Sequence, residues 1–307
     1  MSVIEEIGTA VATVAESAGP SIVTIGRNAR GSGVVVGEGQ VLTNAHNLRG
    51  GEITVTFGDG RSTRGTVTGV DPDGDLAVVS VDTAGARAID WGSGDGLAVG
   101  APVFGVAATF GGGVRVTFGL VSSVSRSFRG PGGRRIAGSV EHTAPLAPGS
   151  SGGAIVDASG KFLGLNTNRI GEGFYLALPA DAALRSRVDA LGRGESTKRL
   201  RLGVAIAPSH VARRLRRSVG LPERDGILVR GVEDGSLAEA AGIEPGDLIV
   251  SAGGKPIGDA DDLFDALGGL QPPFELGIVR GAEERTVTVA AATPTGGDRS
   301  ERTPGDA

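Results

Sequence analysis

Hydrophobic and polar residues follow three successive patterns along the chain. Apolar residues recur every three or four positions between Ile4 and Ala15, which predicts an amphipathic helix over residues 2–17. The Gly19-Pro20 pair then ends it. Beyond this point the apolar residues come in short runs rich in Val, Ile, Leu, Phe and Thr, and most runs are separated by glycine or by Asx-Gly pairs. The runs predict strands at 21–25, 32–36, 40–43, 53–57, 65–70, 76–81, 102–107, 116–124, 137–143, 153–157, 161–166 and 174–178.

The twelve predicted strands divide evenly, because six precede the glycine-bearing loop 92–100 and six follow it. This division predicts two small antiparallel barrels. A helix is predicted only after the twelfth strand, over Pro179–Leu191, with the proline at its start. The first half of the chain is therefore expected to be almost entirely β.

The pattern changes again after a polar, glycine-bearing segment. Predicted strands alternate here with short helices at 209–219, 236–241 and 259–267, which indicates an α+β module of about 90 residues. The strands of this module are predicted at 202–206, 226–232, 247–252, 274–279 and 286–290. The predicted organisation is an N-terminal helical segment 1–19, a β domain 20–192, a linker 193–200, an α+β domain 201–292 and a disordered tail 293–307.

Composition excludes several classes of protein. Glycine accounts for 54 of the 307 residues without a Gly-X-Y period, which indicates many tight turns between short strands. The chain has no cysteine, so disulfide scaffolds, thiolate zinc sites and cysteine nucleophiles are excluded. With only three histidines we expect no metal and no cofactor. The net charge of −5 argues against nucleic acid as a partner.

The N-terminus shows no targeting signal. Glu5 and Glu6 stand where a signal peptide would carry basic residues, and no stretch approaches 18 consecutive apolar residues. The sequence as written is therefore expected to be cytoplasmic and to have no membrane span. Export by way of a segment removed from the chain stays open.

Three short segments carry His, Asp and Ser in that order: residues 43–46 (TNAH), 75–78 (DLAV) and 148–153 (PGSSGG). A serine hydroxyl needs a base within hydrogen-bond reach, histidine has a suitable pKa, and a buried carboxylate fixes the imidazole tautomer. We therefore expect His46, Asp75 and Ser151 to be catalytic and to meet in the cleft between the two barrels. The backbone N–H groups of Gly149 and Ser151 are candidates for an oxyanion hole.

Other aspartate, histidine and arginine residues are less well supported as functional residues. Asp71, Asp73 and Asp82 lie at turns, where aspartate is a common turn former. His142 lies on a predicted strand and is expected to be structural or part of a pocket wall. The basic run 213–217 resembles a nucleic-acid patch, but apolar residues on the other helix face make a solvated surface the simpler interpretation.

These motifs resemble those of the HtrA/Deg proteases, a family of trypsin-like serine proteases with a C-terminal PDZ domain. The resemblance spans residues 18–292 and includes residues 161–166 (KFLGLN) and 173–179 (GFYLALP). It implies a mainly β fold, a chymotrypsin/trypsin-like double six-stranded antiparallel β-barrel followed by a small α+β PDZ domain. It also implies that loop 168–173 borders the specificity pocket, with small or aliphatic residues before the cut. The sequence departs from the family pattern at Asn47, Ser150 and Ala154.

The resemblance extends to the α+β module. Residues 201–204 (RLGV) resemble a PDZ carboxylate-binding loop, so Leu202, Gly203 and Val204 are the expected peptide-binding residues. A bound peptide C-terminus would add as a strand beside 202–206, with its side chains toward helix 259–267. Family members often form trimers through N-terminal aromatic residues. The first 56 residues here contain none, so a homo-oligomer stays open.

The leading hypothesis is a serine endopeptidase that cleaves unfolded or damaged proteins through an acyl-enzyme, while the PDZ domain binds peptide C-termini and regulates or recruits. Two alternatives stay open. One is a non-catalytic protease-like chaperone or PDZ scaffold. The other is a peptide-binding protein with weak proteolytic activity.

Overall fold

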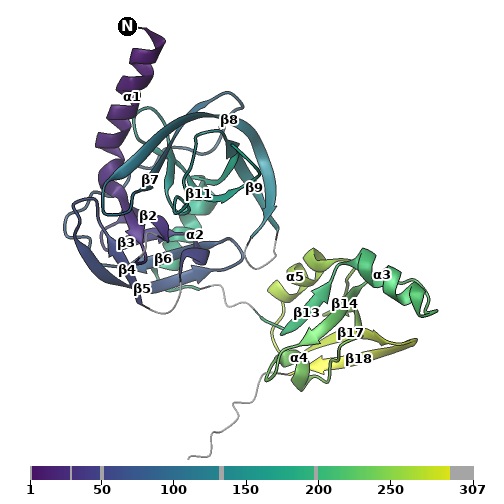
Figure 1. The fold of residues 1–307 in the computed structure, drawn as a ribbon. Helices are drawn as coiled ribbons and strands as arrows, with labels where there is room; N and C mark the ends of the chain where they lie inside the picture. The colour runs from purple at the N-terminus through teal and green to yellow at the C-terminus, as the bar shows by residue number, and fades with distance from the viewer. Residues whose placement is uncertain (1, 28–29, 49–51, 131–134, 197–199, 291–307) are drawn as a thin grey trace, which may run out of the picture. The chain divides into compact units, whose positions relative to one another are not determined.

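The chain forms two compact units, Met1–Lys198 and Arg199–Ala307, in a computed structural model (Figure 1). The structure describes residues 2–27, 30–48, 52–130, 135–196 and 200–290. The boundary between the units falls within the predicted linker 193–200. The predicted tail 293–307 lies outside the described residues.

The first helix, α1 (Val3–Ser17), begins at a capping box. The Ser2 backbone N–H donates to Glu5 Oε2 (2.7 Å), and the Ser2 hydroxyl accepts from the Glu5 N–H. The C-terminal half of α1 buries Val14 against the barrels, whereas Ile4 is 81% exposed in a first turn that projects from the unit (Figure 1). Packing of α1 therefore comes from its last two turns.

The first barrel is a closed ring of six antiparallel strands in the order β1-β2-β3-β6-β5-β4. Pairing of β1 with β4 closes the ring. Its elements are the 3-10 turn η1 (Gly19–Ser21), β1 (Ile22–Ile25), β2 (Gly31–Gly37), β3 (Gln40–Thr43), the 3-10 turn η2 (Ala45–Asn47), β4 (Glu52–Thr56), β5 (Ser62–Asp71) and β6 (Leu76–Ser80).

The second barrel is a closed ring in the order β10-β11-β12-β9-β8-β7. Its strands are β7 (Pro102–Ala108), β8 (Val114–Arg129), β9 (Arg135–His142), β10 (Ala154–Val156), β11 (Phe162–Arg169) and β12 (Tyr175–Pro179). The predicted arrangement of two six-stranded antiparallel barrels is confirmed.

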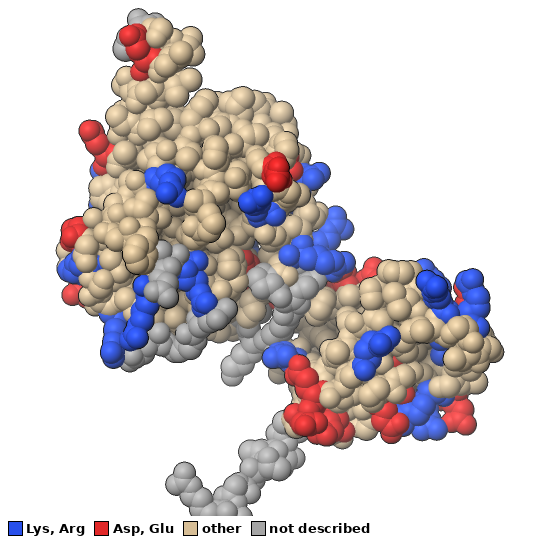
Figure 2. Space-filling model, in the orientation of Figure 1, with Lys and Arg blue, Asp and Glu red and all other residues tan. Residues whose placement is uncertain are grey.

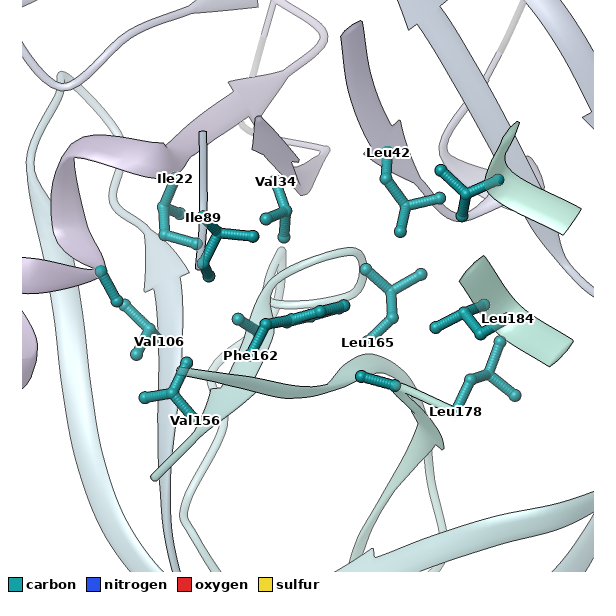
Figure 3. Close-up of a cluster of buried hydrophobic side chains, with 14 of the residues drawn as sticks. Ile22, Val34, Leu42, Ile89, Val106, Val156, Phe162, Leu165, Leu178 and Leu184 are labelled. Atoms are coloured by element: carbon teal, nitrogen blue, oxygen red, sulfur yellow. The ribbon is translucent and has the colours of Figure 1, made fainter. Parts of the chain in front are cut away.

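A shared apolar core joins the two barrels. Figure 3 shows Val34 and Leu42 of the first barrel lying over Phe162 and Leu165 of the second. The rings of Trp91 and Phe162 pack in a T-shaped arrangement, with their centroids 5.1 Å apart. Burial of each such side chain stabilises the folded state by roughly 1.5–3 kcal/mol, so the two barrels form one structural unit.

The second unit is an antiparallel sheet in the order β13-β14-β15-β17-β18, with β16 beside β15 and three helices. Its elements are β13 (Val204–Ala207), α3 (Ser209–Ser218), β14 (Ile227–Val232), α4 (Leu237–Ala240), β15 (Leu248–Ala252), β16 (Lys255–Pro256), α5 (Ala260–Gly268), β17 (Phe274–Arg280) and β18 (Glu283–Val289). This arrangement confirms the predicted α+β module.

Two arginines of the basic run 213–217 on α3 form ion pairs with acidic side chains. Arg213 pairs with Asp225 (2.8 Å) and Arg217 with Glu223 (2.5 Å). Arg216 is buried and donates to the carbonyl oxygens of residues 222 and 281. Figure 2 shows basic and acidic side chains interspersed on the visible face of this unit. These pairings favour a structural role for the run over a nucleic-acid surface.

Three sequence predictions differ from the structure. Pro179 does not begin a helix, because it ends β12, and α2 (Ala182–Gly192) begins after Asp181, whose carboxylate accepts the Leu184 N–H (2.7 Å). The strand predicted at 116–124 extends to Arg129, where register shifts accommodate polar residues that interrupt the apolar pattern. The two-residue strand β16 was not predicted, since it has too few residues for a periodic pattern.

Candidate active site

His46 and Asp75 meet at the ends of two neighbouring strands. His46 lies in η2, directly after β3, and Asp75 directly precedes β6. These strands pair antiparallel, with Thr43 opposite Ala77, which brings the two residues together. His46 Nδ1 lies 2.8 Å from Asp75 Oδ2 and 3.0 Å from Oδ1. The contact fits an imidazole that donates from Nδ1 and leaves the Nε2 lone pair available.

Asp75 is held by both its backbone and its carboxylate. Its φ of 55° is left-handed, a conformation that aspartate tolerates better than most residues. The Asp75 carbonyl oxygen accepts from Asn44 Nδ2 (3.0 Å) and from the Ala45 N–H (3.2 Å), while the His46 N–H donates to Oδ1 (3.1 Å). The side chain is only 1% exposed. These contacts fix the carboxylate toward the His46 ring.

Thr167 is a further partner of Asp75 that the sequence motifs do not predict. Its hydroxyl donates to Asp75 Oδ2 (2.8 Å) from β11 of the second barrel. The buried carboxylate thus joins residues 92 positions apart in the sequence. No motif marks Thr167; the only sequence signal is its position directly after the predicted strand 161–166.

Ser151 lies in a tight loop that precedes β10. Ser151 Oγ donates to the Thr167 carbonyl oxygen (3.0 Å), and in the described part of the chain no hydrogen bond joins it to His46. Gly149 and Gly152 have φ values of 87° and 85°. A Cβ on Gly152 would lie 2.1 Å from the Ser32 carbonyl oxygen, so this left-handed position admits only glycine.

Two backbone amides of this loop are available for a ligand. The Ser150 N–H donates to Ala147 O, the Gly152 N–H to Asn166 O and the Gly153 N–H to Ser150 O. By contrast, the N–H groups of Gly149 and Ser151 have no acceptor among the described residues. These are the same two N–H groups that the sequence predicts as donors of an oxyanion hole.

A cavity of about 610 Å³ contains these groups. Its lining is mostly apolar or uncharged, with Arg129 and Arg169 as the cations and Asp75 as the acid among the described residues. The lining residues are His46, Asp75, Phe128, Arg129, Gly130, Leu146, Ala147, Pro148, Gly149, Ser150, Ser151, Asn166, Thr167, Asn168, Arg169 and Tyr175. Of the predicted pocket-border loop 168–173, Asn168 and Arg169 line this cavity.

His142 lies behind the cavity wall. It is fully buried, and its ring stacks on Tyr175 with centroids 5.8 Å apart. Its Nε2 lies 3.0 Å from Asn166 Oδ1, while Asn166 Nδ2 donates to the Ala154 carbonyl oxygen (2.9 Å). Burial lowers the pKa of His142 from 6.5 to about 4, against the smaller opposing effect of the Asn166 hydrogen bond. The residue therefore supports the wall as a neutral imidazole.

We expect His142 to make stability depend on pH. Its pKa is about 4 in the folded state and 6.5 in the unfolded chain, so the unfolded state binds more protons between these values. The free energy of unfolding should therefore be constant with respect to His142 above pH 6.5. As the pH falls from 6.5 to 4, protonation of the unfolded chain should lower it by on the order of 3 kcal/mol. Urea unfolding between pH 4 and 7 measures this loss. A His142→Gln variant should lack it, and parallel pH profiles for the two proteins would contradict the prediction.

Of the predicted peptide-binding residues, Leu202 and Gly203 directly precede β13 in the second unit and Val204 is its first residue. Leu202 is buried, and its carbonyl oxygen accepts the Ala238 N–H (2.8 Å). Gly203 has a φ of 80°, and a Cβ there would lie 2.2 Å from Ser236 Cβ. Val204 begins β13, which pairs with β14 alone among the described strands. One edge of β13 therefore has no strand partner among the described residues of this unit.

Neither a metal cluster nor a membrane-crossing helix is found in the described residues. No group of three or more His, Asp or Glu side chains there is arranged to hold a metal ion. No helix in the same residues combines the length and apolar character needed to cross a membrane.

Comparisons with known proteins give matches in both units. Residues 31–165 match the trypsin-like peptidase domain family, and residues 228–280 match the PDZ domain family. A protein of Halomonas elongata named as a DegP-like periplasmic serine endoprotease is 31% identical over 84% of this chain. The serine protease HhoA of a Synechocystis species is 34% identical over 86% of this chain and 70% of its own length.

The solved structures agree with these sequence matches. The HtrA-type protease AlgW with a decapeptide superposes with a TM-score of 0.66 at 26% identity, covering 91% of this chain and 97% of the other. The chain spans 55% of the length of the Halomonas relative.

Proposed function

Because the chain belongs to the HtrA/DegP family of serine proteases, we propose that it is an endopeptidase that cleaves unfolded or damaged proteins through an acyl-enzyme on Ser151. The observation that carries this proposal is the shared cavity. The His46–Asp75 pair, the Ser151 hydroxyl and two amides that have no acceptor among the described residues all line it. Such a set of groups suits acyl transfer.

In the proposed reaction, the Ser151 hydroxyl leaves the Thr167 carbonyl oxygen and donates to His46 Nε2. Ser151 Oγ attacks the scissile carbonyl carbon while His46 accepts the proton, and Asp75 stabilises the imidazolium that forms. The imidazolium then gives the proton to the leaving amine as the C–N bond breaks. A water molecule attacks the resulting ester in the same way, and its proton passes through His46 back to Ser151.

The two available amides would stabilise the oxyanion of each tetrahedral intermediate. The N–H groups of Gly149 and Ser151 already lie beside the nucleophile, and neither has to break a protein hydrogen bond in order to donate. Removing one such donor in other enzymes lowers kcat by about 10²–10³-fold. The free amides therefore support catalysis over a purely scaffolding role.

The cavity lining supports cleavage after small or aliphatic residues. Leu146, Ala147 and Pro148 contribute apolar surface. The acid in the described lining, Asp75, is bound to His46 and Thr167. A lysine or arginine side chain would therefore find no free carboxylate to pair with among these residues.

A fluorophosphonate probe tests the catalytic proposal directly, because it reacts with an activated serine without needing the natural substrate. The wild-type protein should become labelled and should also cleave unfolded casein. If the wild-type protein neither reacts nor cleaves, the chain is instead a non-catalytic chaperone or PDZ scaffold.

We propose further that the second unit binds peptide C-termini by adding the peptide as a strand to β13. The unpaired edge of β13 and the left-handed Gly203 beside it support this mode. The half-buried Val204 and Ile206 on this strand favour a peptide that ends in an aliphatic residue. Occupancy of this edge would then regulate the protease unit or recruit substrates to it.

Peptide binding is expected to require a free C-terminal carboxylate. A fluorescein-labelled decapeptide ending in Val-COOH should bind at least about tenfold more tightly than its carboxamide, because the charged carboxylate forms stronger hydrogen bonds to backbone N–H groups. Fluorescence anisotropy on the Ser151→Ala protein measures both affinities without cleavage of the probe. Equal affinities for the two peptides would contradict capture of the carboxylate.

A further inference from the structure

The carbonyl oxygen of Ser151 accepts two hydrogen bonds from the first barrel. The backbone N–H of Ser32, on β2, donates to it at 2.8 Å. The side-chain Nδ2 of Asn47 donates to it at 2.9 Å. Asn47 directly follows His46 in η2, so the loop of the nucleophile is tied to the turn that carries the proposed base.

The side chain of Asn47 occupies a site shaped for an amide. It is 3% exposed, and Nδ2 also donates to Thr43 Oγ1 (3.0 Å), whose hydroxyl donates to the Ser32 carbonyl oxygen (2.7 Å). A Cβ on Gly31 would lie 2.3 Å from Asn47 Cγ, and one on Gly152 would lie 3.0 Å from Nδ2. Two glycines therefore leave the space that the amide fills.

A second contact holds the loop on the other side of the Ser151 N–H. The Ser32 hydroxyl donates to the Gly149 carbonyl oxygen (2.9 Å) and accepts the Ala108 N–H (3.1 Å). Because a peptide group is planar, a held carbonyl fixes the orientation of its whole plane. The planes on both sides of the Ser150–Ser151 peptide, which carries the Ser151 N–H, are thus fixed from the first barrel.

We propose that Asn47 is a positioning residue of the hydrolytic reaction, whose amide holds the Ser151 carbonyl so that the Ser151 N–H stays directed at the developing oxyanion. The inference rests on the proposed function, since it assigns Asn47 a role in that reaction. Preorganised donors contribute to catalysis because they need no reorganisation as charge develops. Loss of this hydrogen bond should therefore affect the transition state more than substrate binding.

The test compares Asn47→Val and Asn47→Asp with a matched control. Valine removes the donor, and aspartate keeps the shape but presents a carboxylate oxygen to the Ser151 carbonyl. The control is Ser21→Ala in the same barrel, because the buried Ser21 hydroxyl has no hydrogen-bond partner in the described structure. Labelling rate by the fluorophosphonate, kcat, KM, urea midpoint and amide hydrogen exchange of residues 149–153 are measured for each protein.

Both Asn47 variants are expected to lower the labelling rate and kcat by about three- to tenfold, because this factor corresponds to the net free-energy contribution of one hydrogen bond. The KM of each variant should stay within about twofold of the wild-type value. Exchange in residues 149–153 should become faster in both variants and stay unchanged in Ser21→Ala. A lower urea midpoint with unchanged kcat and unchanged amide hydrogen exchange in residues 149–153 would show that Asn47 only stabilises the fold. That result would overturn the inference. If the wild-type protein is itself unreactive, the proposed function fails, and unchanged exchange in the variants would still refute the positioning of the loop.

Discussion

Replacing Ser151 by alanine is expected to lower casein cleavage by about 10⁵- to 10⁶-fold and to abolish fluorophosphonate labelling. The variant keeps the backbone N–H groups of the loop but lacks the hydroxyl that would form the acyl-enzyme. Because Ser151 Oγ makes one hydrogen bond within the described residues, to the Thr167 carbonyl oxygen, its removal should leave the fold intact. Circular dichroism and the urea midpoint check this, and peptide mass analysis of digested casein measures the residual rate.

A suitable control for this variant is Ser159→Ala. The Ser159 hydroxyl donates to Asp157 in an exposed turn (2.7 Å), outside the cavity lining. This variant should cleave and label like the wild type. If Ser151→Ala kept a tenth or more of the wild-type activity, the nucleophile would have to be another residue, and the mechanism proposed for the cavity would be wrong.

Asp75→Asn should lower kcat by about 10⁴-fold while the protein remains folded. The carboxylate accepts hydrogen bonds from His46 Nδ1, the His46 N–H and the Thr167 hydroxyl. An asparagine side chain can direct an N–H at His46 Nδ1, which favours the tautomer protonated at Nε2. That tautomer cannot accept the Ser151 proton at Nε2. The general base is therefore lost although the side chains keep their positions.

The control for the carboxylate is Asp82→Asn. Asp82 accepts the Ala84 N–H (2.9 Å) in an exposed turn and was one of the alternative aspartates in the sequence. Its variant should keep wild-type kcat/KM on a peptide substrate. Comparable loss in both variants would indicate that general destabilisation, not the imidazole tautomer, explains the effect at Asp75.

The strand pattern and the three motifs were readable from the sequence because each depends on neighbouring residues. Alternating apolar runs and glycine turns define the twelve strands, and His46, Asp75 and Ser151 lie in short segments of recognisable chemistry. The structure brings His46 and Asp75 into contact and lines one cavity with all three.

The contacts of Thr167, Ser32 and Asn47 could not be derived in this way. Ser32 reaches Gly149 across 117 positions and Thr167 reaches Asp75 across 92, so these contacts exist only once both barrels have closed. The helix start was mistaken for a related reason. Pro179 satisfies the local preference for proline in a first helical turn, but strand pairing with Gly164 keeps it in β12.

The distance along the chain between the turn of His46 and the loop of Ser151 means that the proposed site can be completed only late in synthesis. The first barrel is complete in sequence at the end of β6, whereas the loop of Ser151 belongs to a barrel whose last strand, β12, ends at Pro179. Roughly 100 residues separate these points, or about 5–20 s of translation. If Ser151 is the nucleophile as proposed, a nascent chain lacks the complete site during that interval, and we expect it not to digest its own unfolded segments.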